Sequence, residues 1–180
     1  MLRLEVAKAE FYNEITEEFE YIEPTILEIE HSLISISKWE ARWHKPFLST
    51  EEKTVEQINH YLRCMTINRN ISEEVYKALT PQHYKAIQDY MSDPMTATVI
   101  KDGSKSKGNA ETLTSELIYY YMFAHNIPLE CERWHINRLL TLIRVCNIKS
   151  APPKKKPERE VLRDQAALNA ARRKQLNTKG

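Results

Sequence analysis

The side chains best suited to chemistry lie between residues 130 and 146. Cys131 and His135 stand four positions apart, so on a helix both could face the same point. A zinc ion needs three or four such ligands, and Cys146 lies about 22 Å further along a helix that rises ~1.5 Å per residue. The spacing therefore predicts two packed side chains beside Trp134 rather than a metal site.

Acid–base and nucleophilic chemistry find equally little support. Glu130 and Glu132 flank the same segment, but residues two apart on a helix point about 200° away from each other and cannot share one substrate. No serine stands in a Gly-x-Ser-x-Gly turn. The three glycines, at 103, 108 and 180, are too few and too scattered for a phosphate-binding loop. We therefore expect no catalytic residues, no nucleotide and no other cofactor.

Charge is divided unevenly along the chain. The net charge is +1, yet residues 150–180 contain nine basic and three acidic residues, a net +6, which leaves −5 for residues 1–149. Clustered Lys and Arg bind nucleic acid weakly and in a salt-dependent way, but this segment has no aromatic side chain to stack on bases. We therefore expect no specific nucleic acid. A solvated arm and a docking arm for an acidic partner protein are the other interpretations.

The elements that must position these residues are mostly helices. Residues 1–30 alternate apolar and polar side chains with a period of two, as in Leu2, Leu4 and Val6, which predicts a small antiparallel β-sheet. Residues 31–44 have a helical apolar stripe, although their alternating serines also fit a strand.

Capping residues mark the expected helix starts. Ser49 with Glu52 has the spacing of a capping box, Ser72 precedes two glutamates, and Thr80 is followed by proline at the first helical position. Two long apolar segments follow an exposed loop at 101–109. These segments are 114–125 and 130–147, and we expect them to be helices that form the core.

The predicted fold class is mainly α (α+β), with one compact helical domain over residues 1–149 and a small N-terminal antiparallel β-sheet in about 1–30. Prolines around three lysines in 150–157 predict an extended linker. Residues 158–180 form a basic C-terminal arm, helical over 158–176. No apolar run is long enough for a membrane span, no export signal is recognised, and three cysteines at no disulfide spacing suit a reducing cytosol.

Five segments resemble tail assembly chaperones of long, flexible-tailed (siphovirus-type) bacteriophages. They are SKWEARWHKPFL (37–48), MTAT (95–98), LTSELIYYYM (113–122), IPLECERWHINRLLTLIRVCNIK (127–149) and ALNAARRKQLNTKG (167–180). None of them contains a catalytic motif, and the resemblance depends on their order and spacing. It covers about residues 25–149 and the tail, and it is weakest in the N-terminal strands.

The resemblance implies a non-catalytic chaperone that binds the tape measure protein, keeps it soluble and promotes polymerisation of the tail tube around it. Its partners would be the tape measure protein and the major tail tube protein, with self-association as a further expectation. It would act in the cytoplasm of the infected bacterial host and be absent from the mature virion. Related proteins are often made in a longer form by programmed ribosomal frameshifting, for which the codons of residues 154–156 are a candidate site.

Two groups of residues form the candidate binding site. Aromatic clusters such as Trp39, Trp43 and Phe47 usually belong to a core, and the alternative is an aromatic-lined groove for the apolar helix of a partner. The basic arm supplies charge, which also keeps open the alternative of a phage-encoded nucleic-acid-binding or regulatory protein. The residues expected to contact a partner are Trp39, Trp43, Phe47, Lys154, Lys155, Lys156, Arg172 and Arg173.

Overall fold

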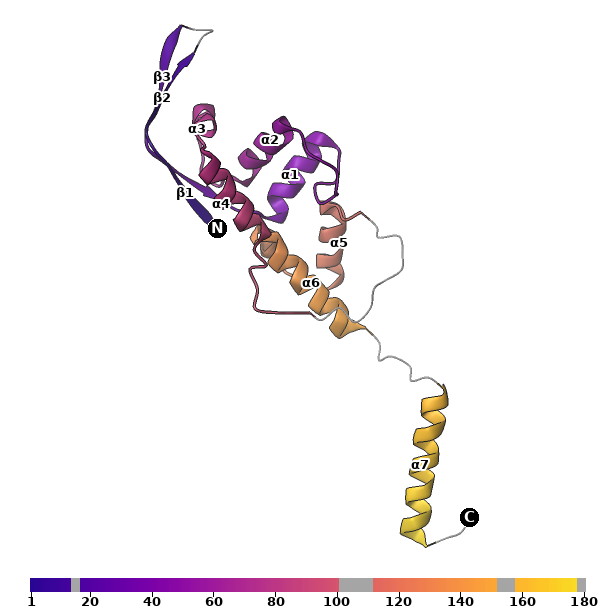
Figure 1. Cartoon of the computed structure of the whole chain (residues 1–180). Coiled ribbons are helices and arrows are strands. Elements are labelled where there is room, and N and C mark those ends of the chain that lie inside the picture. The colour runs from indigo at the N-terminus through magenta and orange to yellow at the C-terminus, as the bar shows by residue number, and fades with distance from the viewer. Residues whose placement is uncertain (14–16, 101–111, 152–157, 178–180) are drawn as a thin grey trace. The chain divides into compact units, whose positions relative to one another are not determined.

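The computed structural model describes residues 1–13, 17–100, 112–151 and 158–177 (Figure 1). It is mainly helical with a small antiparallel sheet, which confirms the predicted α+β fold class. The predicted loop at 101–109 and the linker lysines lie outside the described residues.

The N-terminal strands form one long two-stranded antiparallel ribbon. β1 (Leu2–Val6) pairs with β4 (Thr25–Ile29), and β2 (Ala9–Asn13) pairs with β3 (Glu18–Ile22). Both pairings keep the same register, in which the numbers of two paired residues always total 31. Pro24 lies opposite the gap between β1 and β2, and because proline has no N–H to donate, it explains why the ladder is interrupted there.

The ribbon changes its packed face at this interruption. In the half formed by β1 and β4, the buried side chains are Leu4, Val6, Leu27 and Ile29. In the half formed by β2 and β3, the side chains that pack against the core are Ala9, Phe11 and Ile22. If the alternation of the first half continued through the interruption, these residues would lie on the opposite face of the ribbon. Two-stranded ribbons twist strongly, and the twist brings this second face towards the helices. Tyr12, Phe19 and Tyr21 consequently lie on the solvent side and are exposed.

Helix α1 (Leu33–Trp43) is the centre of the core. It contacts α2 (Val55–Met65) and α5 (Ser115–Ala124), and it is capped by Ser32, whose side chain accepts the Ser35 N–H. The main core cluster includes side chains of α1, α5 and α6 (Ile136–Ser150), namely Leu33, Ile36, Trp39, Ile118, Met122, Ile136, Leu139 and Ile143. The helical interpretation of 31–44 is confirmed.

One buried carboxylate connects α1 to two distant segments. Glu40 is only 7% exposed. Its Oε1 accepts the backbone N–H of Phe47 at 2.7 Å, and its Oε2 accepts the backbone N–H of Ser115 at 2.8 Å. Since Ser115 is the first residue of α5, the negative charge sits at the positive end of that helix, where it is stabilised.

Helices α2, α3 (Glu73–Lys77) and α4 (Pro81–Ser92) follow in order, and α3 contacts β3 while α4 contacts β1 (Figure 1). The predicted starts of α3 and α4, after Ser72 and Thr80, are confirmed. The predicted capping box of Ser49 and Glu52 is wrong. Helix α2 begins five residues later, where Thr54 and Gln57 form the capping box, because residues 44–53 form the irregular segment that leads away from α1.

The predicted continuous helix over 130–147 is also wrong. A short 3-10 helix, η1 (Leu129–Arg133), is separated from α6 by Trp134 and His135. The backbone is extended there because it pairs with the segment before α1: the Ile136 N–H donates to the carbonyl of His31 at 2.7 Å, and Ser32 forms an isolated β-bridge with His135. This long-range pairing overrides the helical preference of the local sequence.

The chain divides into two compact units, Met1–Cys146 and Asn147–Gly180. In the second unit, α7 (Glu158–Leu176) occupies the predicted residues 158–176, which confirms a helical arm. Among the described residues, no helix combines the length and the apolar character that crossing a membrane requires.

Candidate functional site

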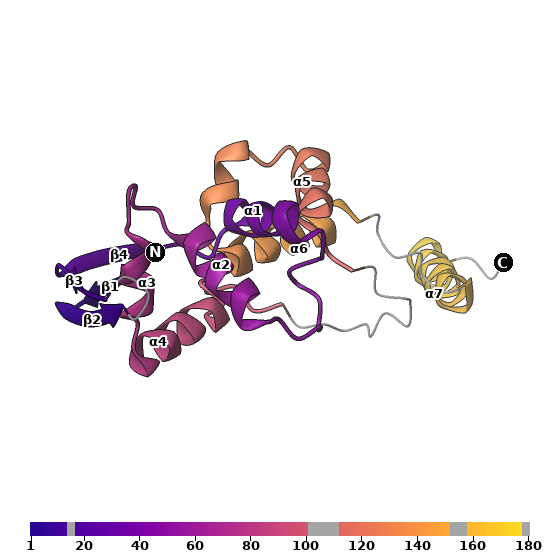
Figure 2. The same cartoon turned by 90° about the horizontal axis from the view of Figure 1, so that it is seen from above.

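An open groove of about 640 Å³ is lined mainly by residues of α2 and α4. Figure 2 shows where these two helices lie in the fold. The groove is mostly apolar, and it is lined by the buried Met65 on α2, 1% exposed, and by the partly exposed Met91 on α4. Methionine side chains are flexible and polarisable, so they adapt to apolar partners of different shape. The lining residues are His31, Phe47, Leu48, Lys53, Ile58, Tyr61, Leu62, Met65, Tyr84, Ile87, Gln88, Met91, Ser92 and Asn137.

Helical spacing places the wall residues. Ile58, Tyr61, Leu62 and Met65 recur at intervals of three and four along α2, so they share one face of the helix. The corresponding residues of α4 are Tyr84, Ile87, Gln88 and Met91. Ile58 is 43% exposed and Tyr84 38% exposed, so the rim of the groove is accessible.

Buried aromatic and imidazole rings form the floor. The rings of Phe47 and Tyr61 stack with their centroids 3.9 Å apart. The Tyr61 hydroxyl lies 2.5 Å from Nδ1 of His31. Beneath this floor, the ring of His135 does not line the groove but lies edge-on to that of His31, with the centroids 5.2 Å apart. This floor joins α2 to the segments before α1 and α6.

The floor carries no charge at neutral pH. Burial, together with the nearby His135, lowers the pKa of His31 to about 3. Burial also lowers the pKa of His135, although its bond to the Tyr90 carbonyl opposes the shift. Burial raises the pKa of Tyr61 well above its ordinary value. The neutral form of each group is the one that a low-dielectric site favours.

The hydrogen bonds of His135 fix its tautomer. Its Nε2 lies 3.1 Å from the Tyr90 carbonyl oxygen and therefore donates, while its Nδ1 accepts the Asn137 N–H at 3.3 Å. The Asn137 side chain in turn donates to the carbonyls of Met91 and Asp93, at 3.0 and 2.7 Å. These bonds hold the end of α4 against the start of α6 and so fix the width of this end of the groove.

One cation stands at the rim. The Lys53 ammonium lies 4.8 Å from the ring centroid of Phe47 and 5.9 Å from that of Trp39. Burial lowers the pKa of Lys53, partly offset by Glu51. An apolar groove with a neutral floor and a cationic rim is suited to an apolar segment that carries acidic residues beside its apolar stripe.

The predicted aromatic contacts are only partly on this groove. Trp39 is 1% exposed and donates its Nε1–H to the Gln57 carbonyl at 2.9 Å, so the core interpretation holds for it and the contact interpretation is corrected. Trp43 is half-buried and donates to Nδ1 of His60 at 3.2 Å. Phe47 is 7% exposed but lines the groove.

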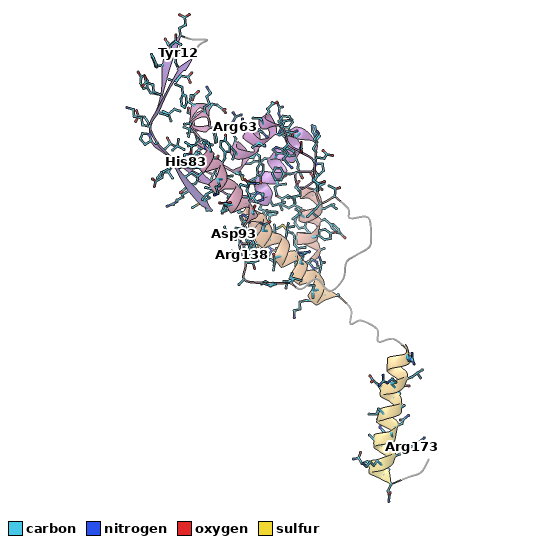
Figure 3. All side chains as sticks on the ribbon, viewed as in Figure 1. Tyr12, Arg63, His83, Asp93, Arg138 and Arg173 are labelled. Atoms are coloured by element: carbon cyan, nitrogen blue, oxygen red, sulfur yellow. The ribbon has the colours of Figure 1, made fainter. Side chains whose placement is uncertain are left out.

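Only some of the predicted contact residues of the basic arm lie in the part of the chain that the structure describes. Lys154, Lys155 and Lys156 lie outside the described residues. Arg172 and Arg173 are exposed on α7 (Figure 3 labels Arg173).

The residues first considered for chemistry serve packing. Cys131 is buried in η1, and burial raises its thiol pKa, with Glu130 contributing further. Arg138, labelled in Figure 3, stacks on Trp134 with its guanidinium carbon 4.0 Å from the ring centroid. Within the ranges that the structure describes, no group of three or more His, Cys, Asp or Glu side chains could hold a metal ion.

The walls of the groove were not among the predicted contacts. Met65 is 1% exposed and Met91 is partly exposed, and the helical apolar pattern of the sequence alone does not reveal which of its residues border an open groove after folding. The available signal was a tyrosine and a methionine on one face of each helix, four positions apart in Tyr61 and Met65 and seven positions apart in Tyr84 and Met91.

Comparison of the chain with protein-family models, curated proteins and solved structures gives no match.

Proposed function

We propose that this protein is a tail assembly chaperone of a long-tailed bacteriophage and that it acts without catalysis. It would bind the tape measure protein in the cytoplasm of the infected host, keep that protein soluble, and be displaced by the major tail tube protein. It would then be absent from the mature virion. The proposal begins from the sequence resemblance over about residues 25–149 and the tail.

The observation that supports it best is the groove between α2 and α4. A long helical protein with apolar stripes aggregates unless those stripes are covered. An amphipathic helix presents its apolar residues at intervals of three and four, and it binds by inserting them into an apolar groove. The groove here is open and uncharged at its floor, and the partly exposed Met91 lines its α4 wall. A flexible methionine side chain suits many related segments rather than a single one.

Displacement requires each contact to be weak. Copies that bind along one long target gain avidity from repetition. A tube subunit that competes for the same stripe can therefore release them one at a time. The accessible rim of the groove, formed by Ile58 and Tyr84, is consistent with such shallow binding.

Co-expression with the long open reading frame beside the gene tests the proposal. The wild-type chain should keep the tape measure product soluble and co-purify with it. The double variant Ile58→Glu with Tyr84→Glu should lose both effects, because two carboxylates would then face the apolar groove. Val55→Glu is the matched control, since Val55 is 74% exposed on the same helix but does not line the groove.

Three outcomes would contradict the proposal. The tape measure product could stay insoluble with the wild-type chain, the wild-type chain could fail to co-purify with it, or the groove variant could behave like the Val55→Glu control. Circular dichroism of both purified variants should match that of the wild type, because all three replaced side chains are exposed in the folded chain.

A further inference from the structure

The outer side of the ribbon is an exposed apolar surface that the groove does not include. Tyr12, Phe19 and Tyr21 are 54%, 56% and 63% exposed, and Ile26 on β4 is 53% exposed. Tyr12 and Phe19 are cross-strand partners whose ring centroids are 5.2 Å apart. We call these four residues the outer ribbon face; Figure 3 labels Tyr12 near the tip of the ribbon.

This face lies in the most acidic part of the chain. Residues 1–30 contain nine glutamates and two basic residues, a formal net charge of −7, and Glu20, Glu28 and Glu30 form ion pairs within the chain. Glu10 is exposed and is the cross-strand partner of Tyr21, and Glu23 is exposed two residues beyond Tyr21. A partner for the outer ribbon face must therefore offer apolar side chains together with positive charge.

Helix α7 has this combination. Leu162, Leu168 and Leu176 are 59%, 52% and 71% exposed, and residues 150–180 carry a net charge of +6. Arg172 follows Leu168 by four positions, so the two share one side of the helix. The 19 residues of α7 span about 28 Å, which equals eight or nine residues of a β-strand.

We propose that α7 of one copy docks on the outer ribbon face of a second copy. The leucines cover the aromatic side chains, and Arg172 and Arg173 face Glu10 and Glu23. Because each copy supplies one helix and accepts another, the contact is heterologous and produces a ring or an open chain of copies. This inference does not depend on the tape measure protein, and it is tested without it.

The first test measures self-association of the nuclease-treated full chain by sedimentation velocity over a concentration series. In about 0.05 M salt the wild type should associate, and in about 0.5 M salt association should weaken, because exposed charges are then screened. Arg172→Glu with Arg173→Glu should weaken association by about tenfold or more, as should Glu10→Lys with Glu23→Lys.

Mixing the two charge-reversed variants is the decisive test. Each variant alone brings like charges together at the contact. In the mixture, the acidic α7 of the helix variant meets the basic ribbon of the ribbon variant. The basic α7 of the ribbon variant likewise meets the acidic ribbon of the helix variant. Association should therefore recover towards the wild-type strength. The control is Arg69→Glu with Lys85→Glu, at two exposed positions outside α7 and the ribbon. It changes the net charge by the same amount as Arg172→Glu with Arg173→Glu and should leave association unchanged.

The apolar part of the contact has its own matched pair. Tyr21 and Tyr120 are both 63% exposed, but Tyr120 lies on α5. Tyr21→Ser should weaken association at both salt concentrations, and Tyr120→Ser should not. Three results would overturn the proposal: a wild type that remains monomeric, a mixture whose association does not recover, or two tyrosine variants with equal effects. If α7 docked on its own chain instead, the wild type would remain monomeric.

Discussion

Replacing Glu40 by glutamine should destabilise the fold through two backbone groups that are far apart in the sequence. The carboxylate accepts one N–H from Phe47 at 2.7 Å and another from Ser115 at 2.8 Å. A glutamine amide has only one oxygen, so its NH₂ group must face one of these N–H donors. Because Glu40 is only 7% exposed, water cannot readily replace the lost acceptor.

The size of the effect follows from the number of bonds lost. One hydrogen bond to a charged group contributes about 1.5 to 3 kcal/mol, and a buried N–H left without a partner costs a similar amount. We therefore expect Glu40→Gln to lower the free energy of unfolding by about 2 kcal/mol and Glu40→Ala, which removes both acceptors, by about 4 kcal/mol. For a chain of this size, 2 kcal/mol corresponds to a fall in Tm of about 4 to 8 °C.

Urea unfolding followed by circular dichroism measures these differences. Glu52→Gln is the control, because Glu52 is exposed and its replacement should change the free energy of unfolding by less than about 0.5 kcal/mol. If Glu40→Gln is as stable as the Glu52→Gln control, the carboxylate does not connect α1 to α5 in the way described. Equal losses for Glu40→Gln and Glu40→Ala would contradict the count of one bond against two.

Three further predictions follow from the core, the caps and the groove floor. Trp39→Ala should lower the free energy of unfolding by about 3 to 5 kcal/mol in urea titration, as expected for a core residue; a loss of partner binding at unchanged stability would contradict this. In the same titration, Thr54→Ala should lower the free energy of unfolding by about 1 kcal/mol and Ser49→Ala by less than about 0.5 kcal/mol. A larger loss for Ser49→Ala than for Thr54→Ala would support a capping box at Ser49 instead. Because the folded-state pKa of His31 is lowered to about 3, the unfolded state binds more protons below the ordinary pKa of about 6.5, so stability should fall as pH drops from 6.5 towards 3, by up to about 1.4 kcal/mol per pH unit. His31→Gln should flatten this slope, and an unchanged slope would contradict the assignment.

Local signals in the sequence predicted most of the elements. Thr80 followed by Pro81, and Ser72 followed by two glutamates, specify helix starts through bonds within one turn, so no other part of the chain is needed. The two-residue alternation of the N-terminal strands is equally local. The break at Trp134 and His135 could not be predicted in this way, because it depends on pairing with His31, about a hundred positions earlier in the chain.

The candidate site was harder to predict for the same reason. The aromatic cluster was recognised, but whether Trp39 lies in the core or on a surface depends on the position of α2, whose Gln57 carbonyl accepts its N–H. The groove arises from the uncovered faces of α2 and α4, and the amphipathic pattern of each helix gives no sign that part of its apolar face stays open. Phe47 was selected from the sequence and does line the groove, whereas Met65 and Met91 were identified only from the structure.

The reversal of the packed face along a single register has a consequence for how the ribbon can vary in length. Adding one residue to β2 between Ala9 and Phe11, and one at the opposite position of β3, would preserve the pairing beyond the addition. It would, however, turn Tyr12 and Phe19 inward and Phe11 outward. Adding two residues to each strand would preserve both pairing and orientation. Between Ala9 and the Tyr12–Phe19 pair, the ribbon can therefore be lengthened only in steps of two residues per strand, while the half formed by β1 and β4 stays unchanged.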